Sequence, residues 1–568
     1  MELQELRHTA AHVMAQAVKR LWPGVKLSIG PAIEDGFYYD FDMEHRLSEE
    51  DFPRIEEEMR KIVEADYPLE RKEVTREEAQ EIFKNEPYKL ELIEDLPDGT
   101  AITTYRQGEF VDLCAGPHVS RTGEVKHYKL LSVAGAYWRG DERRQMLQRL
   151  YATAFFTSEE LEEYVRLREE AAASDHRRLG KELGLFMLAD EAPGEPFLLP
   201  RGVVVFGELI KWWRAVHHSY GYEEIRTPIM LKRYLWERSG HWEHYSQGMY
   251  ALKVDDEDYA IKPMNCPGSI LVFRSLGAVS LMDKAVKLAE LGLVHRAERS
   301  GQLHGLMRVR EFTQDDAHIY CTPENLQSEI AEILEIMDKM YSTLGLTYDL
   351  ELSTRPEDRI GEDSVWDMAE DALKEALKGR EYKINAGDGA FYGPKIDVHV
   401  KDRMRRSWQC GTIQVDFNLP ERFDLTYVES GGGRKRPIML HRVIYGSIER
   451  FFGILIEHFK GAFPVWLAPE QVRIIPIVDK FEAFAQTLAV KLRESDIRVD
   501  VDGRSETLNK RIKLAALAKV PYTVVVGEKE QNSGLLQIRK FGGKSFELPV
   551  EVFVSMLKNK IKNKDLDY

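Results

Sequence analysis

The order of apolar and polar positions divides the chain into regions with different secondary structure. At the start, apolar residues recur at helical spacing, and after them short strand-like runs alternate with acidic helices as far as residue 155. From about residue 180 to 464, helices mix with strand-like runs, several of which follow one another without a helix between them. That order favours an antiparallel sheet. The last hundred residues alternate as βαβαββ before a final basic helix, which predicts a compact α/β domain.

A helix is predicted to connect the first two regions. Residues 157–178 contain no Pro or Gly and begin with Thr157 and Ser158 followed by acidic residues, a typical helix start. We therefore expect a multidomain protein of the α+β and α/β classes. The predicted parts are an α+β domain at 1–156, a linker helix at 157–178, an antiparallel-sheet domain at 179–464 and an α/β domain at 465–568.

Charge and cysteine content narrow the class of protein. A net charge of -16 argues against indiscriminate nucleic-acid binding, but Lys and Arg outnumber Asp and Glu by 13 to 7 in residues 503–568. Further basic clusters occupy 175–181, 401–406 and 433–437. Each cluster alone is explained by a solvent-exposed charged surface. Together, the clusters could bind a polyanion at several places. Four cysteines, no signal-peptide pattern and no apolar run of ~20 residues predict a cytoplasmic protein without a membrane segment.

Two pairs of residues near the start of the chain have the spacing of metal ligands. His8 and His12 lie four apart on one face of a predicted helix, and Cys114 and His118 are also four apart. Three imidazoles and a thiol form a reasonable zinc site. Spacing alone leaves zinc and metal-free chemistry open.

The segment at 292–321 carries an unusual number of polar residues on a predicted strand. Arg308, Arg310, Gln314 and Asp316 all occupy even-numbered positions, so on a strand several polar groups point to one face. Such a face is costly unless ligands or ion pairs satisfy it. The Gly-rich stretch at 385–395 does not have phosphate-loop spacing.

Ordered motifs give the chain a resemblance to class II aminoacyl-tRNA synthetases. "YGYEEIRTP" (220–228), "HRAE" (295–298) and "YGSIERFFGILIEH" (445–458) resemble their motifs 1, 2 and 3. "RHTAAH", "DHRRLGKELGLF", "IKPMNCPGS", "FTQDDAHIYCT", "FYGPKIDV", "WQCGTIQVDF" and "PIMLHRVIYGSIERF" are similar to the threonyl-tRNA synthetase family. The resemblance implies an editing domain, a class II catalytic domain and an anticodon-binding domain, in that order.

The resemblance implies activation of L-threonine with ATP, transfer to tRNA(Thr), and hydrolytic editing of seryl-tRNA(Thr). Phosphoryl chemistry of this kind needs cations around the phosphates, and Mg²⁺ is expected to accompany ATP. Arg296 would hold the α-phosphate, Arg450 the γ-phosphate and the adenine ring, and Glu298 the adenine edge. Arg308 and Lys395 would meet phosphate or carboxylate oxygens. The expected neighbours of threonine or its adenylate are Gln314, Asp316, Gln409 and Gln414.

One zinc per subunit is implied at Cys266, His318 and His441, which no spacing rule would have grouped. A metal that requires a hydroxyl rejects valine but not serine, because one methyl is worth only ~1–3 kcal/mol. A second, hydrolytic site is therefore needed. The family's editing residues correspond to His8, His12, Lys89, Asp112, Cys114 and His118, and the resemblance favours hydrolysis without metal.

Further expectations concern partners and alternatives. Glu530 and Arg539 match positions that read anticodon bases, although ordinary surface charges would look the same. Motif 1 around Pro228 implies a homodimer, and the chain is expected to lack the family's N-terminal ubiquitin-like domain. The alternatives are a prolyl or seryl synthetase, a synthetase-like RNA-binding regulator without catalysis, and a free-standing editing hydrolase.

Overall fold

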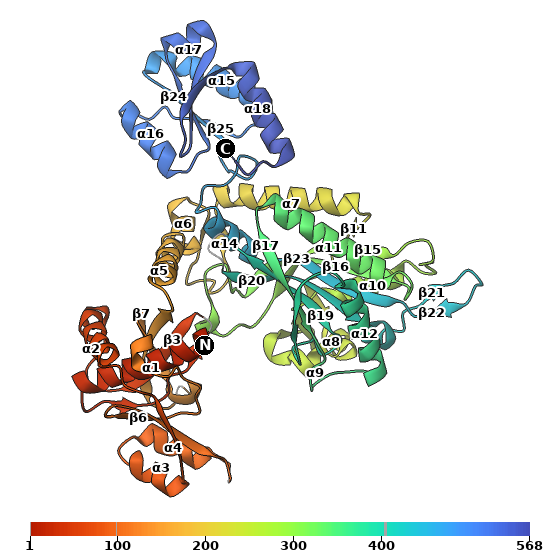
Figure 1. The fold of residues 1–568 in the computed structure, drawn as a ribbon. Coiled ribbons are helices and arrows are strands. Elements are labelled where there is room, and N and C mark those ends of the chain that lie inside the picture. Colours follow the sequence, from red (N-terminus) through yellow and green to blue (C-terminus); the bar gives the residue numbers. More distant parts are fainter. Residues whose placement is uncertain (1, 34, 98, 142, 403–405, 568) are drawn as a thin grey trace. The chain divides into compact units, whose positions relative to one another are not determined.

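The computed structural model forms two compact units, Met1–Glu169 and Glu170–Tyr568 (Figure 1). It describes residues 2–33, 35–97, 99–141, 143–402 and 406–567, so residues 403–405 of the basic cluster at 401–406 lie outside the described residues. No helix in the described part of the chain has both the length and the apolar character needed to cross a membrane.

Unit 1 is an α+β structure built from antiparallel strands. Its first helix, α1 (Leu3–Leu21), packs on the larger sheet, and Ala10, Ala11 and Ala15 are fully buried where it does so. The larger sheet contains β1 (Lys26–Leu27), β2 (Ala32–Ile33), β3 (Gly36–Asp42), β8 (Met146–Phe155) and β7 (His127–Tyr137), with α2 (Phe52–Ala65) beside α1. A smaller sheet contains β4 (Glu70–Val74), β5 (Ile102–Gln107) and β6 (Phe110–Leu113), and α3 (Arg76–Ile82) and α4 (Pro87–Asp95) accompany it.

The predicted helix over 157–178 is interrupted in the structure. α5 (Ser158–Ala173) has no buried residue, and α6 (His176–Glu182) begins after Asp175, whose carboxylate accepts from the Arg177 amide. A side chain that satisfies the first free amides favours a new helix start at this point. The domain boundaries themselves stay predictions.

Unit 2 is organised around an eight-stranded, mainly antiparallel sheet, as the sequence predicts. Only its two outer pairs, β11 with β15 and β17 with β18, are parallel among the described strands. The order is β11 (Glu223–Glu224), β15 (Val286–His295), β16 (Glu311–Cys321), β23 (Ile438–Ser447), β20 (Ser407–Asp416), β19 (Lys395–Lys401), β17 (Thr347–Ser353) and β18 (Tyr382–Asn385).

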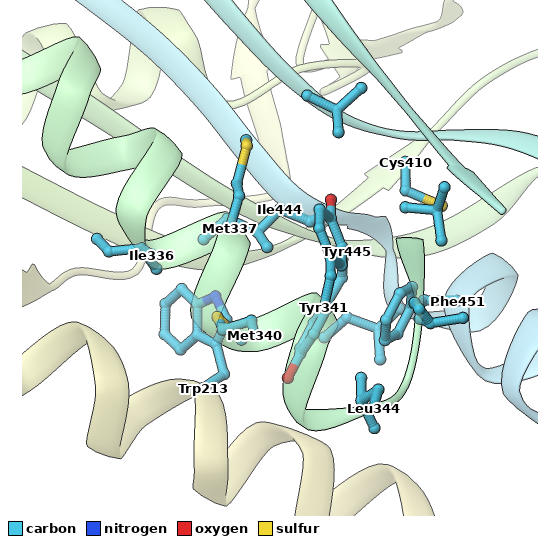
Figure 2. Packing of buried hydrophobic residues seen from close by; sticks show 14 of the residues in the cluster. Trp213, Ile336, Met337, Met340, Tyr341, Leu344, Cys410, Ile444, Tyr445 and Phe451 are labelled. Atoms are coloured by element: carbon cyan, nitrogen blue, oxygen red, sulfur yellow. The ribbon is translucent and has the colours of Figure 1, made fainter. Parts of the chain in front are cut away.

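Helices and two small sheets surround this central sheet. α7 (Pro200–Ser219), α11 (Leu326–Thr343) and α14 (Ile448–His458) contribute to a core that includes Trp213, Met340, Tyr341 and Tyr445 (Figure 2). The other elements are β9 (Phe186–Met187), β10 (Phe197–Leu198), β12 (Met230–Lys232), α8 (Arg233–Ser239), α9 (His241–Tyr245), β13 (Tyr250–Val254), β14 (Glu257–Ile261), α10 (Cys266–Ser275), α12 (Asp363–Ala376), α13 (Asn418–Arg422), β21 (Tyr427–Val428) and β22 (Arg434–Lys435).

The C-terminal part of unit 2 confirms the predicted α/β pattern. Its sheet has the order β25-β24-β26-β27-β28, parallel among the first three strands and antiparallel afterwards. The short helix α17 (Glu528–Ser533) and the fifth strand, β28, were not predicted. The elements are β24 (Val472–Pro476), α15 (Glu482–Arg493), β25 (Val499–Val501), α16 (Leu508–Leu517), β26 (Tyr522–Val526), β27 (Leu535–Lys540), β28 (Ser545–Pro549) and α18 (Val550–Asn563).

Candidate active sites

A cavity of about 280 Å³ opens on the central sheet of unit 2. Strand β16, the loop before it, β20, β23 and the start of α14 supply its walls. The predicted activation residues gather here, and the lining includes Arg296, Glu298, Arg308, Gln314, Asp316, Gln409, Gln414 and Arg450 together with Cys266 and His441.

Lys395 is not among the residues that line this cavity. Its ammonium group lies 2.5 Å from Asp397 and 3.0 Å from Asp388, and Asp397 is almost fully buried. In this structure the lysine therefore neutralises two carboxylates, and its contact with a phosphate or substrate oxygen stays a prediction.

The three predicted zinc ligands come together from three elements. Cys266 begins α10, and His318 and His441 face each other directly in the register of β16 and β23. One ligand atom from each lies within 4.8 Å of the others, and all three residues are buried. Their proximity follows from strand pairing and could not be read from their spacing in sequence.

The hydrogen bonds of this trio leave nitrogen atoms available. His441 Nε2 donates to Asp416 Oδ2 at 2.9 Å, since a carboxylate only accepts. His441 Nδ1 and His318 Nε2 are buried without a hydrogen-bond partner among the described residues. Unpartnered buried nitrogens beside a thiol, with one imidazole oriented by a carboxylate, fit a zinc site.

Burial dominates the electrostatics around the trio. It raises the pKa of the Cys266 thiol, lowers the pKa of His318 well below its usual value, and raises the pKa of Asp316 to about 7. Burial also lowers the pKa of His441, but Cys266 and Asp416 outweigh it and raise that pKa to about 10. A carboxyl group such as Asp316 becomes an anion readily only when a cation lies beside it.

Three arginine side chains, Arg296, Arg308 and Arg450, add positive charge to the lining of the cavity. Arg450 Nε donates to the carbonyl oxygen of Met307 at 2.8 Å, and Arg308 pairs with Glu298 at 2.9 Å. Burial lowers the pKa of the Arg450 guanidinium, and Arg296 and Arg308 lower it further by repulsion. Clustered cations of this kind favour a phosphate-bearing ligand.

Two residues of this region were missed by the sequence analysis. Tyr392 lines the cavity and donates to Gln414 Oε1 at 2.7 Å; it lies within the quoted "FYGPKIDV" motif, which could have drawn attention to it. Asp315 occupies a bulge between Gln314 and Asp316 and accepts from the amides of Ile444, Tyr445 and Gly446. Nothing in its spacing distinguishes it from its neighbours.

The second predicted site forms within unit 1. His8 and His12 lie on α1, and Cys114 and His118 lie on the loop after β6. One ligand atom from each lies within 4.8 Å of the other three. Cys114 Sγ is 3.2 Å from both His8 Nε2 and His118 Nε2, so the four residues form one compact cluster.

Backbone and hydroxyl contacts fix the tautomers of two of these imidazoles. His8 Nδ1 lies 3.2 Å from the Pro117 carbonyl oxygen and must donate to it. The Thr9 hydroxyl already donates to a backbone carbonyl, so at 3.1 Å it accepts from His118 Nδ1. Both Nε2 atoms therefore present a lone pair towards Cys114.

The remaining predicted residues lie directly behind this cluster. Asp112 is buried 2.5 Å from Lys89, 2.6 Å from the hydroxyl of Tyr39 and 3.6 Å from His12 Nε2. Tyr39 was not predicted, because on strand β3 it reads as an ordinary core residue. Burial lowers the pKa of His12 to about 3 and raises the pKa of Cys114 to about 11, so both are neutral at neutral pH.

The two predicted anticodon residues lie on separate elements of the C-terminal sheet domain. Glu530, in α17, is buried, and its carboxylate accepts from the Gly527 amide at 2.8 Å. Arg539, on β27, is exposed. Their role in reading RNA stays a prediction.

The antiparallel sheet and its arginine-lined cavity together define a class II aminoacyl-tRNA synthetase. Comparison with known proteins agrees: residues 250–459 match the tRNA synthetase class II core domain (G, H, P, S and T). Residues 471–561 match the anticodon binding domain, and residues 102–151 match the threonyl and alanyl tRNA synthetase second additional domain.

Whole-chain similarity specifies the family. The chain is 55% identical over 564 residues to the threonine-tRNA ligase of Syntrophomonas wolfei, covering 98% of this chain and 89% of that one. It is 54% identical over 568 residues to the enzyme of Thermotoga maritima, covering 99% and 88%. A crystal structure of the RNA binding domain of threonyl-tRNA synthetase from Cryptosporidium parvum superposes with a TM-score of 0.66 at 38% identity, covering 68% of this chain and 98% of that one. This chain belongs to the threonine-tRNA ligase family.

The predicted fold class and enzyme class are therefore confirmed. The function is that of a threonyl-tRNA synthetase with an editing domain, and the prolyl, seryl and free-standing hydrolase alternatives are excluded.

Proposed function

We propose that the cavity of unit 2 activates L-threonine with ATP and transfers it to tRNA(Thr), with the residue roles predicted above. The observation that carries the proposal is that Arg296, Arg308 and Arg450 line the same cavity as Asp316. The arginines neutralise the phosphates and hold the α-phosphate in line with the threonine carboxylate. Asp316 accepts a hydrogen bond from the amino group of threonine, and the cation proposed below would supply the positive charge that its buried carboxylate requires. Mg²⁺ accompanies ATP, bound mainly through phosphate oxygens.

Cys266, His318 and His441 are proposed to hold one Zn²⁺ per subunit. The donor set and the unpartnered nitrogens support this assignment. A zinc ion held by only three protein ligands would accept further ligands, and the amino and hydroxyl groups of threonine could fill that role. Gln409 and Gln414 stand beside the same cavity as polar neighbours of the substrate or adenylate.

Unit 1 is proposed to hydrolyse seryl-tRNA(Thr), and to do so without metal. The three imidazoles are neutral, and one nitrogen from each lies in one small cluster with Cys114, so they can orient a water and the 3′-terminal ribose by hydrogen bonds. Lys89 and Asp112 neutralise each other behind them and orient His12. A protonated thiol at Cys114 fits a hydrogen-bonding role better than a nucleophilic one.

Partners and location complete the proposal. Glu530 and Arg539 are proposed to read the anticodon. A homodimer is supported by edge strand β11 of motif 1, by exposed Pro228 after it, and by exposed apolar side chains nearby in sequence at Met230 and Tyr234. Four free cysteines fit a cytoplasmic location.

Threonine-dependent exchange between ATP and pyrophosphate tests the activation site. The wild-type chain should exchange with threonine and much more slowly with serine or valine. Arg296→Ala should reduce kcat/KM by roughly 100-fold or more, as expected for loss of a charge-stabilising group. A folded wild-type chain without exchange would favour the remaining alternative, a regulator that binds RNA without catalysis.

A further inference from the structure

A third cluster of ionisable residues lies outside both sites. Asp175, His176 and Glu457 have side-chain atoms within 4.8 Å of one another. His176, at the first turn of α6, is fully buried, and Glu457, near the end of α14, is almost so. A buried imidazole and carboxylate require partners, and none of the functions above uses them.

Both nitrogens of the His176 ring are already engaged. Nδ1 donates to Glu457 Oε1 at 2.6 Å, and the same oxygen accepts from the His176 amide at 3.0 Å. Nε2 accepts from the amide of Leu306 at 3.0 Å. Because neither nitrogen keeps a free lone pair, the cluster is not a metal site, and the ring instead joins two segments.

The backbone of the motif 2 loop lies very close to the His176 ring. Leu306 is fully buried in the motif 2 loop, between β15 and β16. Its neighbour Gly305 has φ +51, and a Cβ there would lie 2.1 Å from His176 Nε2. A Cβ on Gly453 of α14 would lie 3.2 Å from the Leu306 side chain. The loop is therefore packed between α6 and α14, with the imidazole bonded to its backbone.

The next residues of the loop belong to the activation cavity. Met307 presents its carbonyl oxygen to Arg450 Nε, and Arg308 pairs with Glu298. Arg450 lies on α14, the same helix as Glu457. The ring thus bonds at one nitrogen to the helix that carries Arg450 and at the other to the loop that orients its guanidinium.

We infer that His176 is a positioning residue that holds the motif 2 loop against α14 and so sets Arg450 and Arg308 for ATP. This inference rests on the proposed roles of those two arginines. Loss of the Leu306 bond should free the loop without removing any group that touches substrate.

Two substitutions of His176 test its two hydrogen bonds separately. An Asn side chain resembles the Nδ1 edge of histidine, so His176→Asn keeps the donor to Glu457 and loses the acceptor for Leu306. His176→Gln places an amide oxygen within reach of the Leu306 amide. His217→Asn is the matched control, because His217 is also buried in unit 2 and its Nδ1 donates to the Trp213 carbonyl, away from the loop.

Hydrogen exchange of the peptide containing Leu306 and the KM values in pyrophosphate exchange are measured on the full chain. His176→Asn should accelerate exchange at this peptide and raise the KM for ATP about five- to ten-fold, the effect of one lost hydrogen bond. The KM for threonine and the deacylation of seryl-tRNA should stay unchanged, and His176→Gln should recover most of the ATP effect. His217→Asn should alter neither loop exchange nor the KM for ATP.

Three outcomes would overturn the inference. They are an unchanged Leu306 peptide in His176→Asn, a faster-exchanging loop with an unchanged KM for ATP, and equal losses in the Asn, Gln and His217 variants. Arg450→Ala is assayed beside them. If that variant also leaves the KM for ATP unchanged, the proposed role of Arg450 fails, whereas the exchange result still reports on the His176 bond.

Discussion

At the scale of single residues, the activation site depends on a buried carboxylate that touches no predicted ligand. Asp315 is fully buried and accepts from the amides of Ile444, Tyr445 and Gly446, and also from the indole nitrogen of Trp213 at 3.2 Å. All of these groups are donors, so an amide in its place would turn an NH₂ group towards N–H groups. These hydrogen bonds to the Asp315 carboxylate therefore fix the bulge that orients Gln314 and Asp316.

We predict that Asp315→Asn lowers the free energy of unfolding by about 3 kcal/mol, because at least one buried donor loses its acceptor. Urea unfolding of the full chain measures the change. Asp338→Asn is the control, since Asp338 is half-exposed and pairs with Arg380; its effect should stay within about 1 kcal/mol. Equal effects of the two substitutions would show that the backbone does not depend on Asp315.

The ion pair behind the editing cluster gives a second residue-scale prediction, one that depends on pH. Burial raises the pKa of Asp112, but Lys89, His12 and Tyr39 lower it more, so the net pKa lies below the ordinary value. A carboxylate with a lowered pKa stabilises the folded state above its unfolded pKa of ~3.9, and this contribution is lost as pH falls below that value.

Lys89→Met should therefore destabilise unit 1 by roughly 3–5 kcal/mol at pH 7, because it leaves a buried charge unpaired. The loss of stability should shrink as pH falls. The same substitution should also reduce seryl-tRNA deacylation. Melting of the full chain at several pH values measures the stability, and a deacylation assay measures the activity. Lys84→Met, which removes an exposed partner of Glu81, should change neither stability nor deacylation; a pH-independent loss in Lys89→Met would contradict the ion-pair account.

At the scale of elements, the sequence predicts the helices and strands that local residue patterns determine. It does not predict which residues become neighbours when strands pair. The local pattern of apolar and polar residues was enough to predict the helix of His8 and His12 and four of the five strands in the C-terminal sheet. His318 and His441 are neighbours only because β16 and β23 pair in one register, and no spacing contains that information. The resemblance to a known family supplied these residues. The break at Asp175 was missed, because no Pro or Gly marks it.

The junction of β23 and α14 provides a prediction at the same scale. Gly446 has φ +77, and a Cβ there would lie 2.6 Å from the Cys410 carbonyl oxygen on β20. Gly446→Ala should therefore displace the start of α14 and with it Arg450, which raises the KM for ATP several-fold and lowers the melting temperature. Gly207→Ala is the control: it lies within α7 with no atom within 4 Å of the added Cβ, and it should be neutral or slightly stabilising.

At the scale of the whole molecule, the two units contain similar sets of metal-type ligands with different environments. In unit 2, one imidazole of the trio donates to a buried carboxylate, and two of its ring nitrogens have no hydrogen-bond partner in the part of the chain that the structure describes. In unit 1, a backbone carbonyl and a threonine hydroxyl hold two imidazoles, and the thiol already contacts both. We predict zinc in the first site only. Because the cores of the two units are separate, loss of either site should leave the chemistry of the other intact.

Elemental analysis of the full chain, purified without added metal, should give about one zinc per chain. Cys266→Ala should lose that zinc and threonine-dependent pyrophosphate exchange, but keep seryl-tRNA deacylation. Cys114→Ala should keep the zinc and the exchange and lose most deacylation. Cys321→Ala removes a buried cysteine outside both clusters and controls for general destabilisation. Two zinc ions per chain, one lost in each of the first two variants, would make the editing site a zinc hydrolase and refute the metal-free mechanism, because its neutral imidazoles would then be metal ligands and could not orient the water directly.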